Sequence, residues 1–287
     1  MIRSQERGGR VGAAAVAALA SRLTERDRLV ALDCYEHRVL TTEQLRRLHF
    51  RSPSKARRRL QLLYQLRVLD RFRPPRRHGE GSSPYHWILD EAGAHIVAQA
   101  LGLDRSELAW RHQAAIAIAA SSTLAHQLEA NEFFSRLAEE ARQAGGRLAF
   151  WWGERRCLAA LGGQAAADGY GRLELPGQRP VSFLLELDRG TEEHERLRQK
   201  ARRYARALPR SELAADDPVV VVAAPTPARR DNLARALAES SAPLRVITWT
   251  PERSPLAALG EALPLAGTHP SITDDQSDLA PPPAPHA

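Results

Sequence analysis

The fold of the first part of the chain is determined by residues 41–72, TTEQLRRLHFRSPSKARRRLQLLYQLRVLDRF. This stretch predicts two helices, a break between them and the first strand of a hairpin. Thr41 and Gln44 have the spacing of a capping box, which starts the first of these helices. Pro53 suits the first turn of the second, which we expect to run to about Leu66. A helix capped by Thr24 is expected to precede them, so three helices follow one another along the chain.

The third of these helices has two unlike faces. Ala56, Leu60 and Leu63 recur at helical spacing and predict a buried stripe. Arg57 and Arg58 project from the opposite side. One face of the helix is therefore expected in the core, and the other in solvent.

Residues 68–73 and 85–89 read as two strands joined by a loop rich in Arg, Gly, Ser and Pro. Three helices followed by such a hairpin match a winged helix-turn-helix, whose third helix suits the major groove of DNA. Ten basic residues and one acid lie between positions 51 and 77. The predicted DNA-binding residues are Lys55, Arg57, Arg58, Arg59, Arg73, Arg76 and Arg77. The alternatives are a solvated face of an ordinary helical domain and a protein-binding module of the same fold.

Composition agrees with a folded protein that binds a polyanion. The 287 residues are 43% hydrophobic and 26% charged, with a net charge of +7, which favours polyanionic partners. The two cysteines, Cys34 and Cys157, lack the spacing of a zinc site, so a reducing cytoplasm is expected. No run approaches the roughly 20 apolar residues of a membrane span, and no membrane partner is expected.

The second half of the chain alternates strands and helices. Strands are expected at 148–152, 167–175, 180–188, 219–222 and 245–249, with helices at 122–144, 192–208 and 228–239. Asp168 begins the second of these strands, and Glu186 and Asp188 end the third. Carboxylates gathered in this way can hold Mg²⁺, the ion that activates water for phosphodiester hydrolysis.

The hairpin register decides whether these acids meet. If Leu175 pairs with Arg179, Asp168 lies opposite Glu186 on the same face of the sheet. A turn one residue longer puts Asp168 opposite Leu187 and points the acids apart. Both registers remain open at this point.

The helix expected at 192–208 carries a lysine on its apolar side. Lys200 and Tyr204 fall on the stripe that faces the sheet, while Arg198, Arg202 and Arg206 form a separate stripe. An inward lysine needs a carboxylate partner, or else it reaches solvent along its methylene groups.

With these residues in view, the chain resembles the replication-relaxation family of plasmid and integrative mobile elements over roughly residues 23–250. The likeness rests on the winged helix-turn-helix, on TLAHQLEANEFF at 123–134, and above all on AADGYGRLELPGQRPVSFLLELDRGTEEHERLRQKARRY at 166–204. It implies a role in the replication, DNA relaxation or transfer of a mobile element.

The second half also resembles the PD-(D/E)XK nuclease superfamily, which has the restriction-endonuclease-like fold. Asp168 matches its first acid and Glu186 its second, Asp188 stands where lysine is usual, and Lys200 with Tyr204 occupies the helix motif. The resemblance implies catalytic roles for Asp168, Glu186, Asp188 and Lys200, with Mg²⁺ held by Asp168 and Glu186. Either the lysine has moved to the helix and kept its role, or catalysis has been lost and a charge network kept.

These expectations define an α+β protein with a winged helix-turn-helix followed by an α/β restriction-endonuclease-like domain. The expected division is a flexible leader at 1–20, the winged helix-turn-helix at 21–104, a linker at 105–121, the α/β domain at 122–262, and a disordered Pro-rich tail at 263–287.

Three functions follow from the sequence. The first is a cytoplasmic mobile-element protein that binds double-stranded DNA through residues 41–89, with replication or transfer proteins as further partners. The second is a Mg²⁺-dependent endonuclease, and the third is a transcriptional regulator with an inert second domain. Tyr204, His126 and Asn131 are supporting residues; the last two are offset by about 140° on one helix, which favours structural roles.

Overall fold

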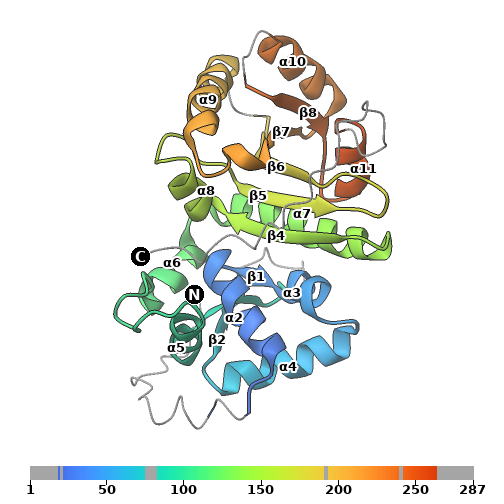
Figure 1. Ribbon diagram of the computed structural model, residues 1–287. Coiled ribbons are helices and arrows are strands. Elements are labelled where there is room, and N and C mark those ends of the chain that lie inside the picture. Colours follow the sequence, from blue (N-terminus) through green and yellow to red (C-terminus); the bar gives the residue numbers. More distant parts are fainter. Residues whose placement is uncertain (1–18, 20–21, 75–82, 191–192, 239–241, 264–287) are drawn as a thin grey trace.

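The computed structural model describes residue 19 and residues 22–74, 83–190, 193–238 and 242–263. The predicted leader and tail lie outside these ranges apart from residues 19 and 263, and so does the hairpin loop with Arg76 and Arg77. The described chain is a mixed α+β protein with two sheets (Figure 1), as the sequence predicted. We call residues 22–101 the first region and residues 124–263 the second region.

The first region has the three helices and the hairpin that the sequence predicted, in the same order, with one added strand and a further helix after the hairpin. Its elements are α2 (Glu25–Glu36), β1 (Leu40–Thr41), α3 (Thr42–His49), α4 (Pro53–Gln65), β2 (Leu69–Phe72), β3 (His86–Leu89) and α5 (Glu91–Ala100). Strand β3 lies between β1 and β2 and is antiparallel to both. The added strand, β1, has only two residues, which is too short for a periodic pattern to reveal.

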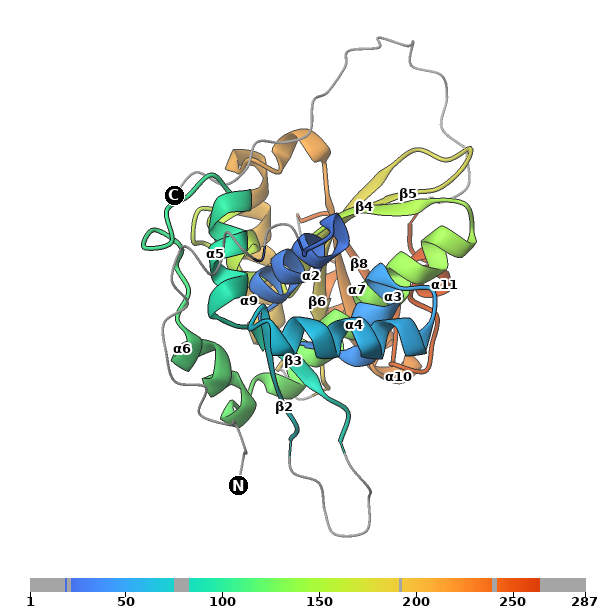
Figure 2. The same ribbon diagram turned by 90° about the horizontal axis from the view of Figure 1, so that it is seen from below.

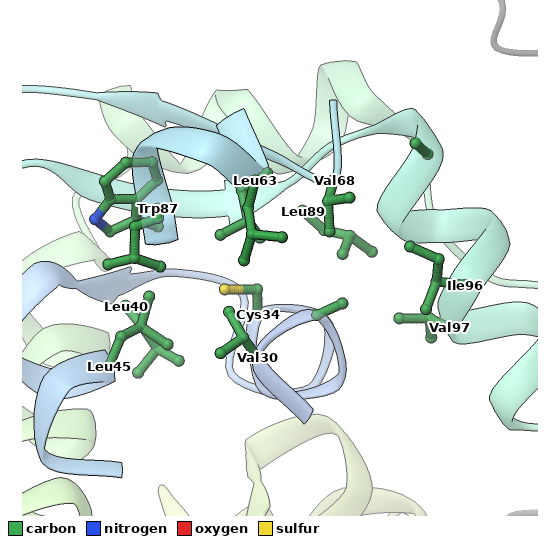
Figure 3. Packing of buried hydrophobic residues seen from close by; sticks show 14 of the residues in the cluster. Val30, Cys34, Leu40, Leu45, Leu63, Val68, Trp87, Leu89, Ile96 and Val97 are labelled. Atoms are coloured by element: carbon green, nitrogen blue, oxygen red, sulfur yellow. The ribbon is translucent and has the colours of Figure 1, made fainter. Parts of the chain in front are cut away.

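Local sequence explains where α3 begins. The Gln44 amide donates to Thr41 Oγ1 at 3.2 Å, and the Thr41 amide donates to Gln44 Oε1 at 2.9 Å, which completes the capping box. The predicted stripe of α4, formed by Ala56, Leu60 and Leu63, is fully buried. Figure 3 shows Leu63 beside the other residues of this core, to which α2, α5 and the sheet contribute.

The second region is built around a five-stranded sheet with helices on both faces. Its elements are α7 (Leu124–Gln143), β4 (Arg147–Gly153), α8 (Glu154–Ala160), β5 (Gly169–Glu174), β6 (Val181–Leu187), α9 (His194–Ala207), β7 (Val219–Ala224), α10 (Pro227–Leu237), β8 (Leu244–Thr248) and α11 (Pro255–Gly260). The strand order is β4-β5-β6-β7-β8; the first three strands are antiparallel and the last three parallel.

Alternate side chains of the strands face different helices. Phe183 and Leu185 pack in a core with residues of α7 and α11, whereas Leu184 packs in a core with residues of α8 and α9. Because successive side chains of a strand point to opposite faces, Glu186 is on the α9 side of the sheet. The short helices α8 and α11 were not predicted from the sequence.

The segment predicted to be a linker at 105–121 contains helical structure. Helix α6 (His112–Ala117) leads into the 3₁₀ turn η1 (Ile118–Ala120). Ile118 is buried with Phe72 and Ile88 of the hairpin, so this segment packs on the first region. His112 also lies 3.0 Å from Asp70 of β2.

Helix α3 joins the first region to α7 of the second. Arg46 forms an ion pair with Glu139 at 2.9 Å and Arg47 with Glu132 at 2.5 Å. Gln44 donates to the Leu128 carbonyl at 3.1 Å. These contacts fix α3, and with it the adjoining α4, relative to the second sheet (Figure 2). None of the described helices is long and apolar enough to cross a membrane.

Candidate functional site

The outer face of α4 carries cations that the rest of the described chain leaves unpaired. Lys55, Arg57 and Arg58 are exposed, and none of them has a hydrogen bond or ion pair with another described residue. They project opposite the buried Ala56 and Leu60. This face is therefore open to an anionic partner.

Arg59, predicted as a DNA-binding residue, is placed differently from its neighbours. Its Nε donates to Asp27 Oδ1 of α2 at 2.8 Å, and its Nη2 contacts the other oxygen of the same carboxylate. Asp27 is buried, and although burial opposes its ionisation, hydrogen bonds from Arg59 and Thr24 hold its pKa below the ordinary value. The Arg59 guanidinium is thus committed to the packing of α2 against α4.

Aromatic rings hold two further arginines at the base of the hairpin. The Arg71 guanidinium lies 4.2 Å from the Tyr64 ring centre and 3.9 Å from that of Tyr85, and it donates to Gln61 Oε1 at 2.7 Å. The Arg73 guanidinium lies 3.8 Å from the ring centre of Tyr85, the residue directly before β3. Such contacts fix a guanidinium while leaving its charge unneutralised.

These arginines line a cavity of about 410 Å³ between α3, α4 and the hairpin, to which Thr42 and Arg57 also contribute. The sequence predicted Arg73 as a DNA-binding residue but not Arg71. The aromatic residues around Arg71 were the available signal for it, and their positions in sequence are too far apart for a spacing rule.

The hairpin of the second sheet has the first of the two registers considered. Gly169 pairs with Leu185 and Leu173 with Val181, so the same register continued by one residue sets Asp168 opposite Glu186. The turn is tight because Gly177 adopts a φ of 69°, where glycine is favoured.

Glu186 is the buried centre of a polar cluster. Its Oε2 accepts from Lys200 Nζ at 2.8 Å, and its Oε1 accepts from the Tyr204 hydroxyl. Burial and the charge of Asp168 raise the pKa of Glu186 to about 7, although Lys200 and Tyr204 act in the opposite direction. The inward arrangement of Lys200, one of the two alternatives, is the one in the structure.

Asp168 is held by His126 of helix α7 and by the backbone of β6. Its Oδ1 lies 2.7 Å from His126 Nε2 of α7, and its Oδ2 accepts from the Leu187 amide at 2.7 Å. The hydrogen bond to Asp168 raises the pKa of His126, although burial lowers it. We define the acidic cluster as Asp168, Glu186, Lys200, Tyr204 and His126.

Asp188 is not part of this cluster. Both of its carboxylate oxygens accept from Arg229 of α10, at 2.6 and 3.1 Å, and the Gly190 amide donates to one of them at 3.2 Å. The side chain is fully buried in this bidentate pair. Asp188, predicted to be catalytic, therefore anchors α10 at the end of β6.

The acidic cluster as arranged does not fit a divalent cation. Each carboxylate oxygen of Asp168 and Glu186 already accepts a hydrogen bond from the protein. Among the described residues, no group of three or more His, Cys, Asp or Glu side chains could hold a metal ion. Mg²⁺ requires a nearly octahedral set of oxygen ligands. Magnesium binding remains a prediction that requires Lys200 or His126 to move.

Asn131 joins the two regions. It is fully buried in α7, and its Nδ2 donates to the Val39 carbonyl at 2.6 Å, while Gln127 donates to its Oδ1 at 3.1 Å. His37 stacks on Trp151 of β4 nearby, with ring centres 3.4 Å apart. Asn131 therefore has a structural role: it holds α7 against the chain between α2 and β1 of the first region.

Comparisons with known proteins gave one family. The family model described as replication-relaxation matches residues 33–217. No curated protein and no solved structure matches the chain. The matched range runs from within α2 to beyond α9, and so it includes both α4 and the acidic cluster. The chain belongs to the replication-relaxation family.

Proposed function

We propose that this protein binds double-stranded DNA through a winged helix-turn-helix in its first region and acts in the replication or relaxation of a plasmid or other mobile element. The family supports the biological role. The observation that carries DNA binding is the set of unpaired cations on α4, Lys55, Arg57 and Arg58. In this they differ from Arg46, Arg47 and Arg59 of the same region, which are paired with acids.

In this proposal α4 enters the major groove and the hairpin base contacts the backbone. Arg57 and Arg58 reach base edges or flanking phosphates, which is the role of a recognition helix. Arg71 and Arg73, held by aromatic rings, take phosphate oxygens in the cavity beside α4. In this arrangement α4 recognises the base sequence, and the hairpin positions the protein on the DNA backbone.

The contacts between α3 and α7 would fix the orientation of the bound DNA. Because Arg46 and Arg47 are paired with acids of α7, bound DNA takes a fixed orientation relative to the second region. The first region therefore acts as the targeting part of a larger DNA-processing unit.

The test compares Arg57→Ala/Arg58→Ala with a matched control, Arg147→Ala/Arg235→Ala, in the full chain. Both pairs remove two exposed arginines, but the control pair lies in the second region. We expect the α4 variant to bind duplex DNA at least about tenfold more weakly. Its log affinity should also fall less steeply with log salt, by about 0.9 for each lost phosphate contact. Unchanged affinity and salt dependence would place the DNA surface elsewhere.

The second candidate function is metal-dependent DNA cleavage by the acidic cluster. The register that sets Asp168 opposite Glu186 favours it, with Lys200 at 2.8 Å from Glu186. The satisfied carboxylate oxygens oppose it. Incubating supercoiled plasmid with the protein and Mg²⁺ or Mn²⁺, beside Glu186→Gln and Lys200→Ala, decides between binding and cleavage. Nicking by the wild type that both variants lose would establish the nuclease; no nicking with either metal would dismiss it.

A further inference from the structure

Helix α9 presents a second basic surface, in the second region. Arg196, Arg203 and Arg206 are exposed on α9, and Arg210 is exposed in the turn that follows it. Their intervals of seven, three and four residues place them along one side of the helix. We call these four residues the α9 stripe. The opposite side of α9, which includes Leu197, is buried against the sheet.

Ion pairs separate this stripe from the other arginines of α9. Glu195 lies 2.9 Å from Arg202 and 3.6 Å from Arg198, so those two charges are partly neutralised. Arg198 also donates to the Ala236 carbonyl at 3.1 Å. The four arginines of the stripe have no hydrogen bond or ion pair with any described residue. The sequence alone grouped Arg206 with the paired arginines.

The α9 stripe is separate from the α4 surface. In Figure 1, α9 lies in the upper part of the molecule and α4 at the bottom, with strands β4 and β5 between their levels. Arg196 and Arg203 are the i−4 and i+3 neighbours of Lys200, so the stripe borders the acidic cluster. A ligand along the stripe would pass beside Lys200.

We propose that the α9 stripe binds the phosphate backbone of a second DNA segment, so that one chain holds two duplexes. Arginine suits phosphate because its planar guanidinium can donate two parallel hydrogen bonds. Ten residues of α9 span about 15 Å, the length over which duplex DNA carries about nine charges. Because contacts to phosphate oxygens carry no sequence information, we expect binding without sequence preference.

This inference rests on the proposed function for the first segment only, which α4 holds. The experiment immobilises one duplex, adds the full-length protein, and measures capture of a second, labelled duplex. Arg203→Ala/Arg206→Ala tests the stripe, and Arg198→Ala/Arg202→Ala is the matched control on the same helix. Binding of a single duplex in solution and size-exclusion chromatography without DNA are measured for each protein.

We expect the stripe variant to capture the second duplex at least about fivefold less well, with single-duplex affinity within about twofold of the wild type. The control variant should capture it normally. Equal capture of the second duplex by the stripe variant and the wild type would overturn the inference, and so would no capture by the wild type. Capture of single-stranded DNA in preference to duplex DNA would also overturn it. If Arg57→Ala/Arg58→Ala binds normally while the stripe variant does not bind, the α4 assignment fails, and the stripe holds the first duplex and not a second one.

Discussion

The exposed face of α4 and the acidic cluster beneath α9 use charged residues in opposite ways. On α4, cations stand in solvent with no described partner. In the acidic cluster, Glu186 is buried and both of its oxygens accept hydrogen bonds from Lys200 and Tyr204. An exposed unpaired cation hardly changes the free energy of folding, whereas a buried carboxylate destabilises the folded state unless it is paired and hydrogen-bonded. Substitutions should therefore affect binding at α4 and stability at the cluster.

The largest expected effect is on stability, from Glu186→Ala. The change removes the acceptor of the buried Tyr204 hydroxyl and of the Lys200 ammonium. We expect the free energy of unfolding to fall by about 2–3 kcal/mol, which is at or below the lower end of the range for a broken buried pair, because Lys200 is partly exposed. Urea denaturation measures it.

The control for this prediction is Glu174→Ala, which removes a carboxylate paired with the exposed Arg147. That variant should lose at most about 0.5 kcal/mol. Folded Glu186→Ala protein should still bind a single duplex as the wild type does. An equal loss of stability in both variants would end the contrast between the two regions.

Two adjacent arginines sharpen the same comparison. Arg58 is exposed and unpaired, whereas Arg59 pairs with the buried Asp27. We expect Arg59→Ala to lower the free energy of unfolding by about 2 kcal/mol, since it leaves a buried carboxylate without its cation. DNA affinity of the folded variant should change by less than about twofold. Arg58→Ala should do the reverse, with weaker DNA binding at unchanged stability; measuring both quantities for both variants tests the assignment.

Much of the fold could be predicted because its signals are local. The start of α3 depends on Thr41 and Gln44, three residues apart, and the buried face of α4 depends on a helical period. The two-residue β1 and the short α8 carry no such period, so they were missed.

The candidate sites could be predicted only in part, because they depend on contacts between distant residues. Arg58 and Arg59 are equivalent in the sequence, and only the packing of Asp27 from α2 distinguishes them. His126 meets Asp168 from 42 positions away, through the placement of α7 over the sheet. The register that sets Asp168 opposite Glu186 follows from the turn at Gly177, for which the sequence allowed two lengths.

The acidic cluster should also change how stability depends on pH. Burial raises the pKa of Glu186 from its ordinary 4.5 to about 7, so the folded state binds more protons than the unfolded state between these values. The contribution of Glu186 to stability should therefore fall as pH rises from about 4.5 to 7, by at most about 1.4 kcal/mol per unit. Glu186→Gln should flatten this fall, as urea titrations at several pH values would show.

His126 provides a second, separable part of the same profile. Its pKa is raised by Asp168, so its contribution is fully present below about 6.5 and is lost as pH rises through the folded-state pKa. His126→Gln should reduce the fall in stability above about pH 6.5, to which His112 also contributes because its hydrogen bond to Asp70 raises its pKa, and should leave the lower part unchanged. Glu186→Gln should do the opposite. Arg57→Ala/Arg58→Ala should leave the whole profile unchanged, because α4 holds no buried titratable group among its described residues. A profile altered equally by all three variants would mean that the two regions are not electrostatically independent.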